Sequence, residues 1–125
     1  MADPIPDVVR RLILERIDSV PELEAILLLR EYPGRDWTAA EASQRLYVSQ
    51  TVGAHILATL AQRGFLVSRE QRYRYEPGSP DLAQTIDALA ETYAHHLVAV
   101  TQLIHAKPSA SVREFAEAFR LRKDK

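Results

Sequence analysis

Residues 37–64 read WTAAEASQRLYVSQTVGAHILATLAQRG, a pattern that predicts two helices joined by a short turn. Thr38 and Glu41 have the spacing of a capping box, in which each side chain accepts a hydrogen bond from a backbone N–H at the start of a helix. Tyr47-Val48-Ser49 interrupts the helical pattern, and Ser49 is a suitable N-cap for the second helix. Gly64 is a natural stop, because glycine readily adopts the left-handed conformation of a helix end.

The second of these helices, residues 49–63, has an apolar face. Helical spacing places Val52, Ile56 and Leu60 inward, with Leu57 at the margin. The opposite face, with Gln50 beside it, then carries Thr51, Ala54, His55, Ala58 and Gln62. Small residues are needed where two helices cross closely, and we expect Ala42 and Ala54 to serve there.

After Gly64 the periodicity changes from helical to alternating. Residues 65–70 and 72–76 are of strand type and predict a hairpin, although its turn lacks Asn-Gly and its register stays open. Alternation places Arg72 and Arg74 on one face of the hairpin, and Tyr73 and Tyr75 on the other face, directed inward.

Two helices are expected before this region. The first has an apolar stripe from Val8 to Ile17 with Asp7 as a candidate N-cap. The second follows a capping box that begins at Ser19, and it is apolar on most sides, as expected for a core helix. Trp37 is large enough to anchor the loop that comes next.

The C-terminal part predicts one long helix and a short final one. An N-cap at Ser79 precedes Pro80, and the long helix carries a continuous apolar seam that ends near Lys107. The seam is formed by Leu82, Ile86, Leu89, Tyr93, Leu97, Val100 and Ile104. A third capping box at Ser111 starts the final helix, whose apolar face consists of Val112, Phe115, Ala116 and Phe119. The seam forms a dimer, packs back on Leu12, Ile13 and Leu27 of the same chain, or does both; its length and the additional Phe115/Phe119 face favour a dimer.

This order of elements resembles the winged helix-turn-helix regulators of bacterial transcription, of the MarR, ArsR and PadR types. The resemblance covers about residues 6–77 and rests on residues 37–49, 51–57 and 63–67 and on the arginine-tyrosine hairpin. It implies a mainly α fold with a small β-hairpin, followed by the long helix and the short final helix. The expected domains are a DNA-binding unit, residues 1–78, and a C-terminal helical dimerisation segment, residues 79–125.

The resemblance also implies a function: a homodimer that binds double-stranded DNA in a sequence-specific way and regulates transcription. The helix 49–63 would enter the major groove, and the hairpin 65–77 would lie against the backbone as a wing. The implied DNA-binding residues are Thr38, Ser49, Gln50, Thr51, Ala54, His55, Arg69, Arg72 and Arg74.

The charge of the chain gives this function uneven support. The formal net charge is −1, whereas nucleic-acid binders are usually basic. Residues 37–78 nevertheless hold five arginines against three glutamates. The outward face of the helix 49–63 has neither Arg nor Lys, so a solvated face, or a winged-helix module that binds a protein partner, is the alternative.

Other functions find little support in the sequence. The chain has no cysteine, no apolar run of membrane-spanning length and no secretory signal at its start, so we expect a cytoplasmic protein that does not act on membranes. No phosphate loop or nucleophile motif indicates an enzyme, and no cofactor is expected. Glu91 and His95, with Asp87 one turn earlier, are too few to favour a zinc site. A small-molecule effector between the winged unit and the long helix is a further, weaker possibility.

Overall fold

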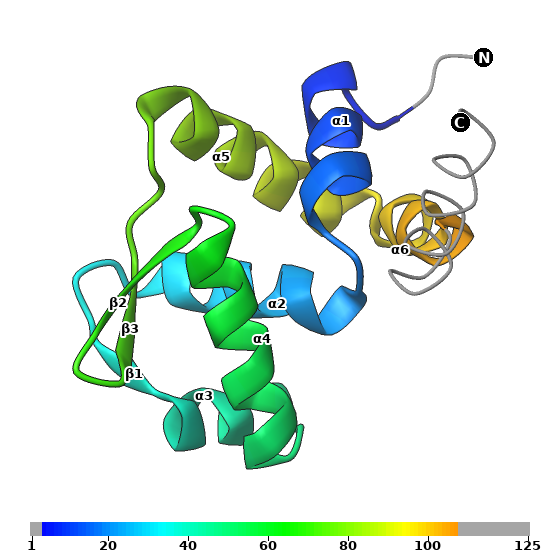
Figure 1. Cartoon of the computed structure of the whole chain (residues 1–125). Coiled ribbons are helices and arrows are strands. Elements are labelled where there is room, and N and C mark those ends of the chain that lie inside the picture. The colour runs from blue at the N-terminus through cyan, green and yellow to red at the C-terminus, as the bar shows by residue number, and fades with distance from the viewer. Residues whose placement is uncertain (1–3, 108–125) are drawn as a thin grey trace, which may run out of the picture.

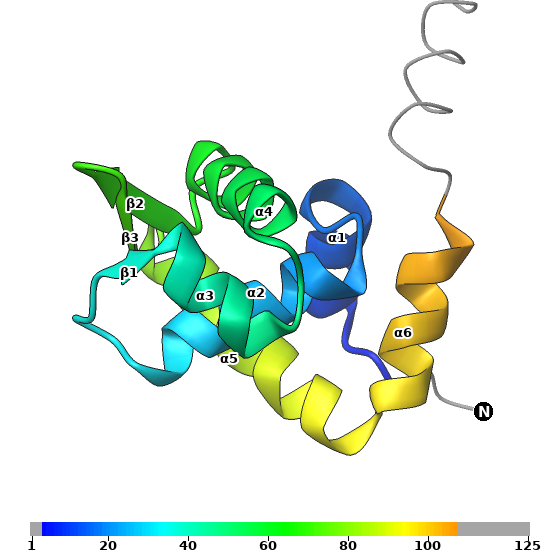
Figure 2. The ribbon, with the colours of Figure 1, turned by 90° about the horizontal axis from the view of Figure 1, so that it is seen from below.

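The computed structural model describes residues 4–107, which form helices around one core with a small sheet at one end (Figure 1). In chain order the elements are α1 (Asp7–Arg16), α2 (Val20–Glu31), β1 (Trp37–Thr38), α3 (Ala39–Leu46), α4 (Gln50–Gln62), β2 (Leu66–Arg69), β3 (Arg72–Tyr75), α5 (Pro80–His95) and α6 (Leu97–Ala106). The sheet and α6 lie at opposite ends of the molecule in both Figure 1 and Figure 2. The expected final helix from Ser111 lies outside the described residues.

The sheet has three antiparallel strands in the order β1-β3-β2, one more than the predicted hairpin. The added strand contains Trp37, which is fully buried and pairs with Tyr73, so the expected anchor is confirmed. Arg69 pairs with Arg72, which fixes the register that the sequence left open. The two loop residues between them, Glu70 and Gln71, both have positive φ (52° and 63°), as in the type I′ turn that matches strand twist.

The capping predictions hold at most helix starts. Ser49 Oγ and Ser79 Oγ each accept a hydrogen bond from the backbone three residues on, and Thr38 forms the complete capping box with Glu41. The expected cap at Asp7 is wrong by one residue. α1 begins at Asp7 itself, and its N-cap is Pro6, which offers no side-chain acceptor.

The predicted inward face of α4 is confirmed only in part. Ile56 and Leu60 are buried, but Val52, also expected inward, is 47% exposed, and Gly53 and Leu57 are buried instead. A Cβ on Gly53 would lie 1.8 Å from Ser43 Oγ and 3.0 Å from Ser43 Cβ. The close crossing of α3 and α4 therefore uses Gly53 against Ser43, not Ala54, because only glycine fits so near the other helix.

The predicted long helix is interrupted. His96, with φ −137° and ψ 49°, ends α5 and separates it from α6. No glycine or proline marks this position. The break allows both helices to pack on the same core as α1, beside which they lie in Figure 1. Tertiary packing thus prevails over the continuous helical pattern.

The apolar seam of these helices packs largely within the chain. Ile86, Leu89, Val100 and Ile104 are buried in the cluster that also contains Leu12 and Ile13. The alternative that the seam packs back on the same chain is therefore confirmed for these four residues. Leu97, in contrast, is 53% exposed.

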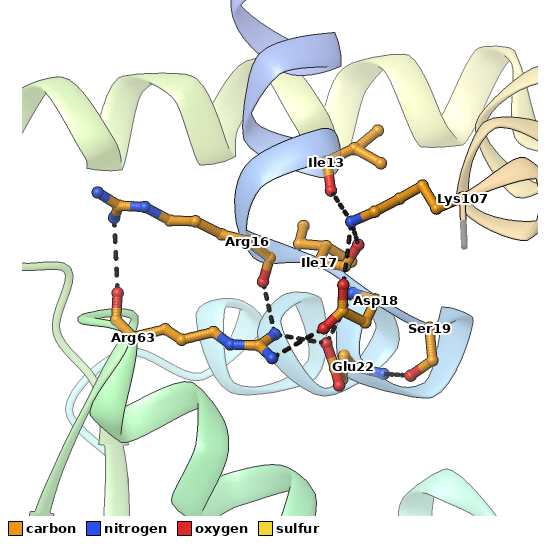
Figure 3. Close-up of polar contacts among 8 residues, drawn as sticks. All are labelled: Ile13, Arg16, Ile17, Asp18, Ser19, Glu22, Arg63 and Lys107. Atoms are coloured by element: carbon orange, nitrogen blue, oxygen red, sulfur yellow. Dashed lines mark hydrogen bonds and ion pairs between the residues drawn. The ribbon is translucent and has the colours of Figure 1, made fainter. Parts of the chain in front are cut away.

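A polar network joins the end of α4 to the turn between α1 and α2 (Figure 3). Arg63 donates hydrogen bonds to Asp18 (2.9 Å), Glu22 (2.9 Å) and the carbonyl of Arg16 (2.7 Å). Glu22 also accepts from the backbone N–H of Asp18 at 2.9 Å. The guanidinium thus fixes the turn after α1 to the C-terminal end of α4.

Lys107, just after α6, enters the same network from the other side (Figure 3). Its side chain is only 5% exposed, and its ammonium donates to the carbonyls of Ile13 (2.6 Å) and Ile17 (2.5 Å) and to Asp18 Oδ1 (3.1 Å). The last carbonyls of a helix lack intrahelical donors and carry the negative end of its dipole. Asp18 therefore contacts two cations, Arg63 at the end of α4 and Lys107 at the end of α6.

Tyr75 carries a buried hydroxyl that has no hydrogen-bond partner among the described residues, and burial raises its pKa. Replacing it by phenylalanine removes an unsatisfied polar group and keeps the ring. We expect Y75F to stabilise the protein by about 1 kcal/mol in urea denaturation. Tyr47→Phe is the control. Because Tyr47 is 95% exposed, the Y47F protein should be as stable as the wild type. A less stable Y75F would show that the hydroxyl is satisfied.

Candidate nucleic-acid interface

The N-terminal half of α4 is largely exposed. Ser49, Gln50, Thr51 and His55 are exposed, while Ala54 is half-buried. Ser49 Oγ accepts from the backbone N–H of Val52 at 3.2 Å, so it holds the first turn in place. The predicted base-reading residues thus lie on one accessible stretch of helix.

A surface hollow joins this stretch to the hairpin. It is lined by Thr38, Ala39, Ala40, Gln50, Ala54, Glu70, Gln71, Arg72 and Tyr73. Four of the predicted DNA-binding residues, from β1, α4 and β3, therefore meet around one concave surface. α3, a three-residue turn and α4 are followed directly by a hairpin that lies beside α4 (Figure 1). The fold is a winged helix-turn-helix.

The wing, β2 and β3 with their loop, carries the three predicted arginines in two different situations. Arg69 and Arg72 are exposed and pair across the hairpin next to its tip. Arg74 instead donates two hydrogen bonds to Asp36, at 2.9 and 3.2 Å. The hydrogen bond from Arg74 lowers the pKa of Asp36, and Asp36 raises that of Arg74, so both are charged at neutral pH.

The Arg74–Asp36 pair changes the expected role of Arg74. Its guanidinium ties the wing to the loop before β1 and is not an unengaged phosphate donor. Sequence reasoning missed this because Asp36 and Arg74 are 38 positions apart. Arg69 and Arg72 remain the accessible cations of the wing.

Thr38 also makes hydrogen bonds within the protein, as the N-cap of α3. Its hydroxyl lies within hydrogen-bond distance of both the backbone N–H and the carboxylate of Glu41, at 3.1 Å each. The hydrogen bond from the Thr38 backbone N–H lowers the pKa of Glu41. Thr38 therefore shapes the rim of the hollow chiefly through the start of α3.

Sequence reasoning missed a cluster of arginines and aromatic rings around Trp37. The Arg35 guanidinium lies 3.6 Å from the ring centre of Trp37, a cation–π distance. Arg45 lies 5.5 Å from the ring centre of Tyr32 and donates to its hydroxyl at 3.4 Å. Arg45, two residues before the turn, is thus held in an exposed position.

The residues weighed for zinc are used differently. His95 Nε2 lies 3.0 Å from Glu91 Oε1, but Asp87 accepts a hydrogen bond from Arg30 at 2.9 Å. Among residues 4–107, no three His, Cys, Asp or Glu side chains are grouped as metal ligands. Within the same range, no helix has the length and apolar character needed to cross a bilayer.

Comparison with solved structures gives a likeness in fold. The winged helix is similar to a MarR family protein from Mycobacterium tuberculosis, at a TM-score of 0.49 and 16% sequence identity. The match covers 93% of this chain and 86% of that chain. MarR is one of the three regulator types that the sequence resembles, and the likeness concerns the fold. No family model and no curated protein matches the sequence.

Proposed function

We propose that this winged helix is a sequence-specific DNA-binding regulator of transcription that acts as a homodimer. The observation that carries the proposal is the continuous surface on which the exposed start of α4, the hollow and the wing meet. α4 enters the major groove, and the wing contacts the backbone of the same duplex.

The exposed side chains of α4 can contact base edges through uncharged polar groups and methyl groups. Gln50 has both an amide donor and an acceptor, which can pair bidentately with adenine. The methyl groups of Thr51 and Ala54 can contact the thymine methyl, and His55 offers a ring N–H. Ser49, with the N-terminus of α4, can position a phosphate. Because α4 contains no Arg or Lys, the positive charge must come from other elements.

The wing and α3 supply that charge. Arg69 and Arg72 stand together next to the hairpin loop, where a duplex held by α4 would pass. Arg74 braces the wing through Asp36, and Arg45 is a further exposed cation on α3.

A homodimer would present two such surfaces to a near-palindromic site. The described residues leave apolar side chains exposed on two neighbouring helices: Val8 (55%) and Leu14 (43%) on α1, and Leu97 (53%) and Val98 (64%) on α6. We assign these residues, with the segment 79–125, to the dimer interface, because exposed apolar side chains gain most from burial against a partner.

Arg72→Ala tests the wing. Losing one phosphate contact should weaken binding to all DNA sequences alike, by about fivefold at low salt, and reduce the slope of log K against log salt by about one. The control is Arg30→Ala, which removes the same charge from α2, where Arg30 pairs with Asp87 and does not line the hollow. Titration of labelled duplexes should show no change for R30A. Equal effects of R72A and R30A would mean that the wing makes no specific contact.

Q50A/H55A separates base contacts from backbone contacts in the same titration. It should change the order of preferred sequences and leave the salt slope unaltered.

A protein-interaction module is the second candidate. It is favoured by Val52, which is 47% exposed on an α4 without cations. In that case R72A and Q50A/H55A would not change the weak DNA binding of the wild type.

A further inference from the structure

Tyr47, the first residue of the turn between α3 and α4, has two energetically unfavourable features. Its backbone is left-handed, with φ 58° and ψ 42°, and its side chain is 95% exposed. A bulky residue with positive φ is strained, because its Cβ approaches the following carbonyl oxygen. Glycine would adopt this conformation without strain. Burial of the ring does not compensate the strain, because almost the whole side chain faces solvent.

Non-glycine residues with a left-handed backbone occur in only two loops of the described chain. Among residues 4–107, the non-glycine residues with positive φ are Tyr47, Glu70 and Gln71. They lie in the helix-turn-helix turn and at the tip of the wing, on either side of the candidate interface. The left-handed positions outside these two loops, at 34 and 64, are both glycine. Strained residues that persist where glycine is available mark functional surfaces.

The position of Tyr47 indicates a contact of particular chemistry. It lies two residues before Ser49, whose side chain caps α4, and two residues after Arg45. A helix N-terminus attracts anions, and Arg45 places a positive charge nearby. The phenol is a neutral donor that can reach beyond the body of the helix-turn-helix.

We propose that Tyr47 binds the DNA backbone, donating its hydroxyl hydrogen to a phosphate oxygen at the edge of the groove that α4 enters. This inference rests on the proposed DNA-binding function. It accounts for an aromatic residue in a conformation suited to glycine. It also gives α4, which has no cation of its own, an anchor on the side opposite the wing.

Two substitutions test the contact. Y47F removes only the hydroxyl, and Y47G also removes the ring and the backbone strain. With a labelled random-sequence duplex of about 30 base pairs at about 50 mM salt, both variants should bind more weakly, Y47F by about three- to tenfold. Y47G should lose at least as much, while its melting temperature equals or exceeds that of the wild type. Because the phenol is uncharged, the salt slope should stay the same in both.

R72A is titrated beside them to separate the two proposals. If R72A binds more weakly and Y47F binds like the wild type, the DNA-binding function stands and the Tyr47 contact is wrong. Weaker binding of Y47G alone would also overturn the hydroxyl contact, because the ring would then suffice. If the wild type does not bind the duplex, both proposals fail, and Tyr47 becomes a candidate for docking a protein.

Discussion

Gly53→Ala should destabilise the protein by about 2–3 kcal/mol, although the same change in most helix interiors is stabilising. Alanine is favoured over glycine within helices by about 1 kcal/mol. At this position its Cβ would meet Ser43 Oγ at 1.8 Å and Ser43 Cβ at 3.0 Å. Rotating the Ser43 side chain would break the hydrogen bond from its hydroxyl to the carbonyl of Ala39 (2.6 Å). It would not move Cβ, so α3 and α4 must separate and lose core packing.

Urea denaturation measures this effect, and two further variants isolate its cause. S43G/G53A moves the small residue to the other helix, so it should recover part of the loss, with a coupling energy of about 1–2 kcal/mol. Ala58→Gly, on the exposed face of α4, should cost about 1 kcal/mol through helix propensity alone. A G53A protein more stable than the wild type would contradict the close crossing that orients α4.

Lys107→Met should cost about 3 kcal/mol. The change keeps most of the apolar stem but removes the ammonium that binds the carbonyls of Ile13 and Ile17 and the carboxylate of Asp18. Removing one partner of a buried charge pair leaves polar groups without compensation, which costs more than the pair contributes. In K107M, Asp18 still pairs with Arg63 at 2.9 Å. The loss of stability should therefore be at the lower end of what is typical when one partner of a buried ion pair is removed.

Thermal and urea denaturation of K107M test this expectation. Gln102→Met, at an exposed position of α6, is the control and should change stability by less than about 0.5 kcal/mol. If K107M matched the control, the ammonium would contribute nothing to joining α6 to the α1–α2 turn. A large loss would show that the ammonium stabilises the packing of α6 against the α1–α2 turn.

The sequence predicted the features that depend on residues close together in the chain. Caps such as Ser49 and Thr38 act within three or four residues, so their patterns predict them well. The wing register was left open because its loop, Glu70-Gln71, is not a common type I′ pair.

The remaining errors come from contacts between distant segments. Gly53 gives no apolar signal, so the periodicity placed Val52 inward. The break at His96 and the Arg74–Asp36 pair depend on tertiary packing that helical spacing does not encode. The sequence indicated that Tyr47 interrupts a helix, and a core position was favoured for its ring; the ring is instead exposed, and exposure and backbone strain are properties of the folded chain.

Selection of random duplex DNA by the purified chain at about 100 mM salt is the most direct test of the central claim, since only specific affinity survives such screening. The account predicts enrichment of a near-palindrome whose half-sites lie about one helical turn apart, as a homodimer that presents two α4 helices requires. If no sequence is enriched and the weak binding disappears with added salt, the chain is not a sequence-specific DNA-binding regulator.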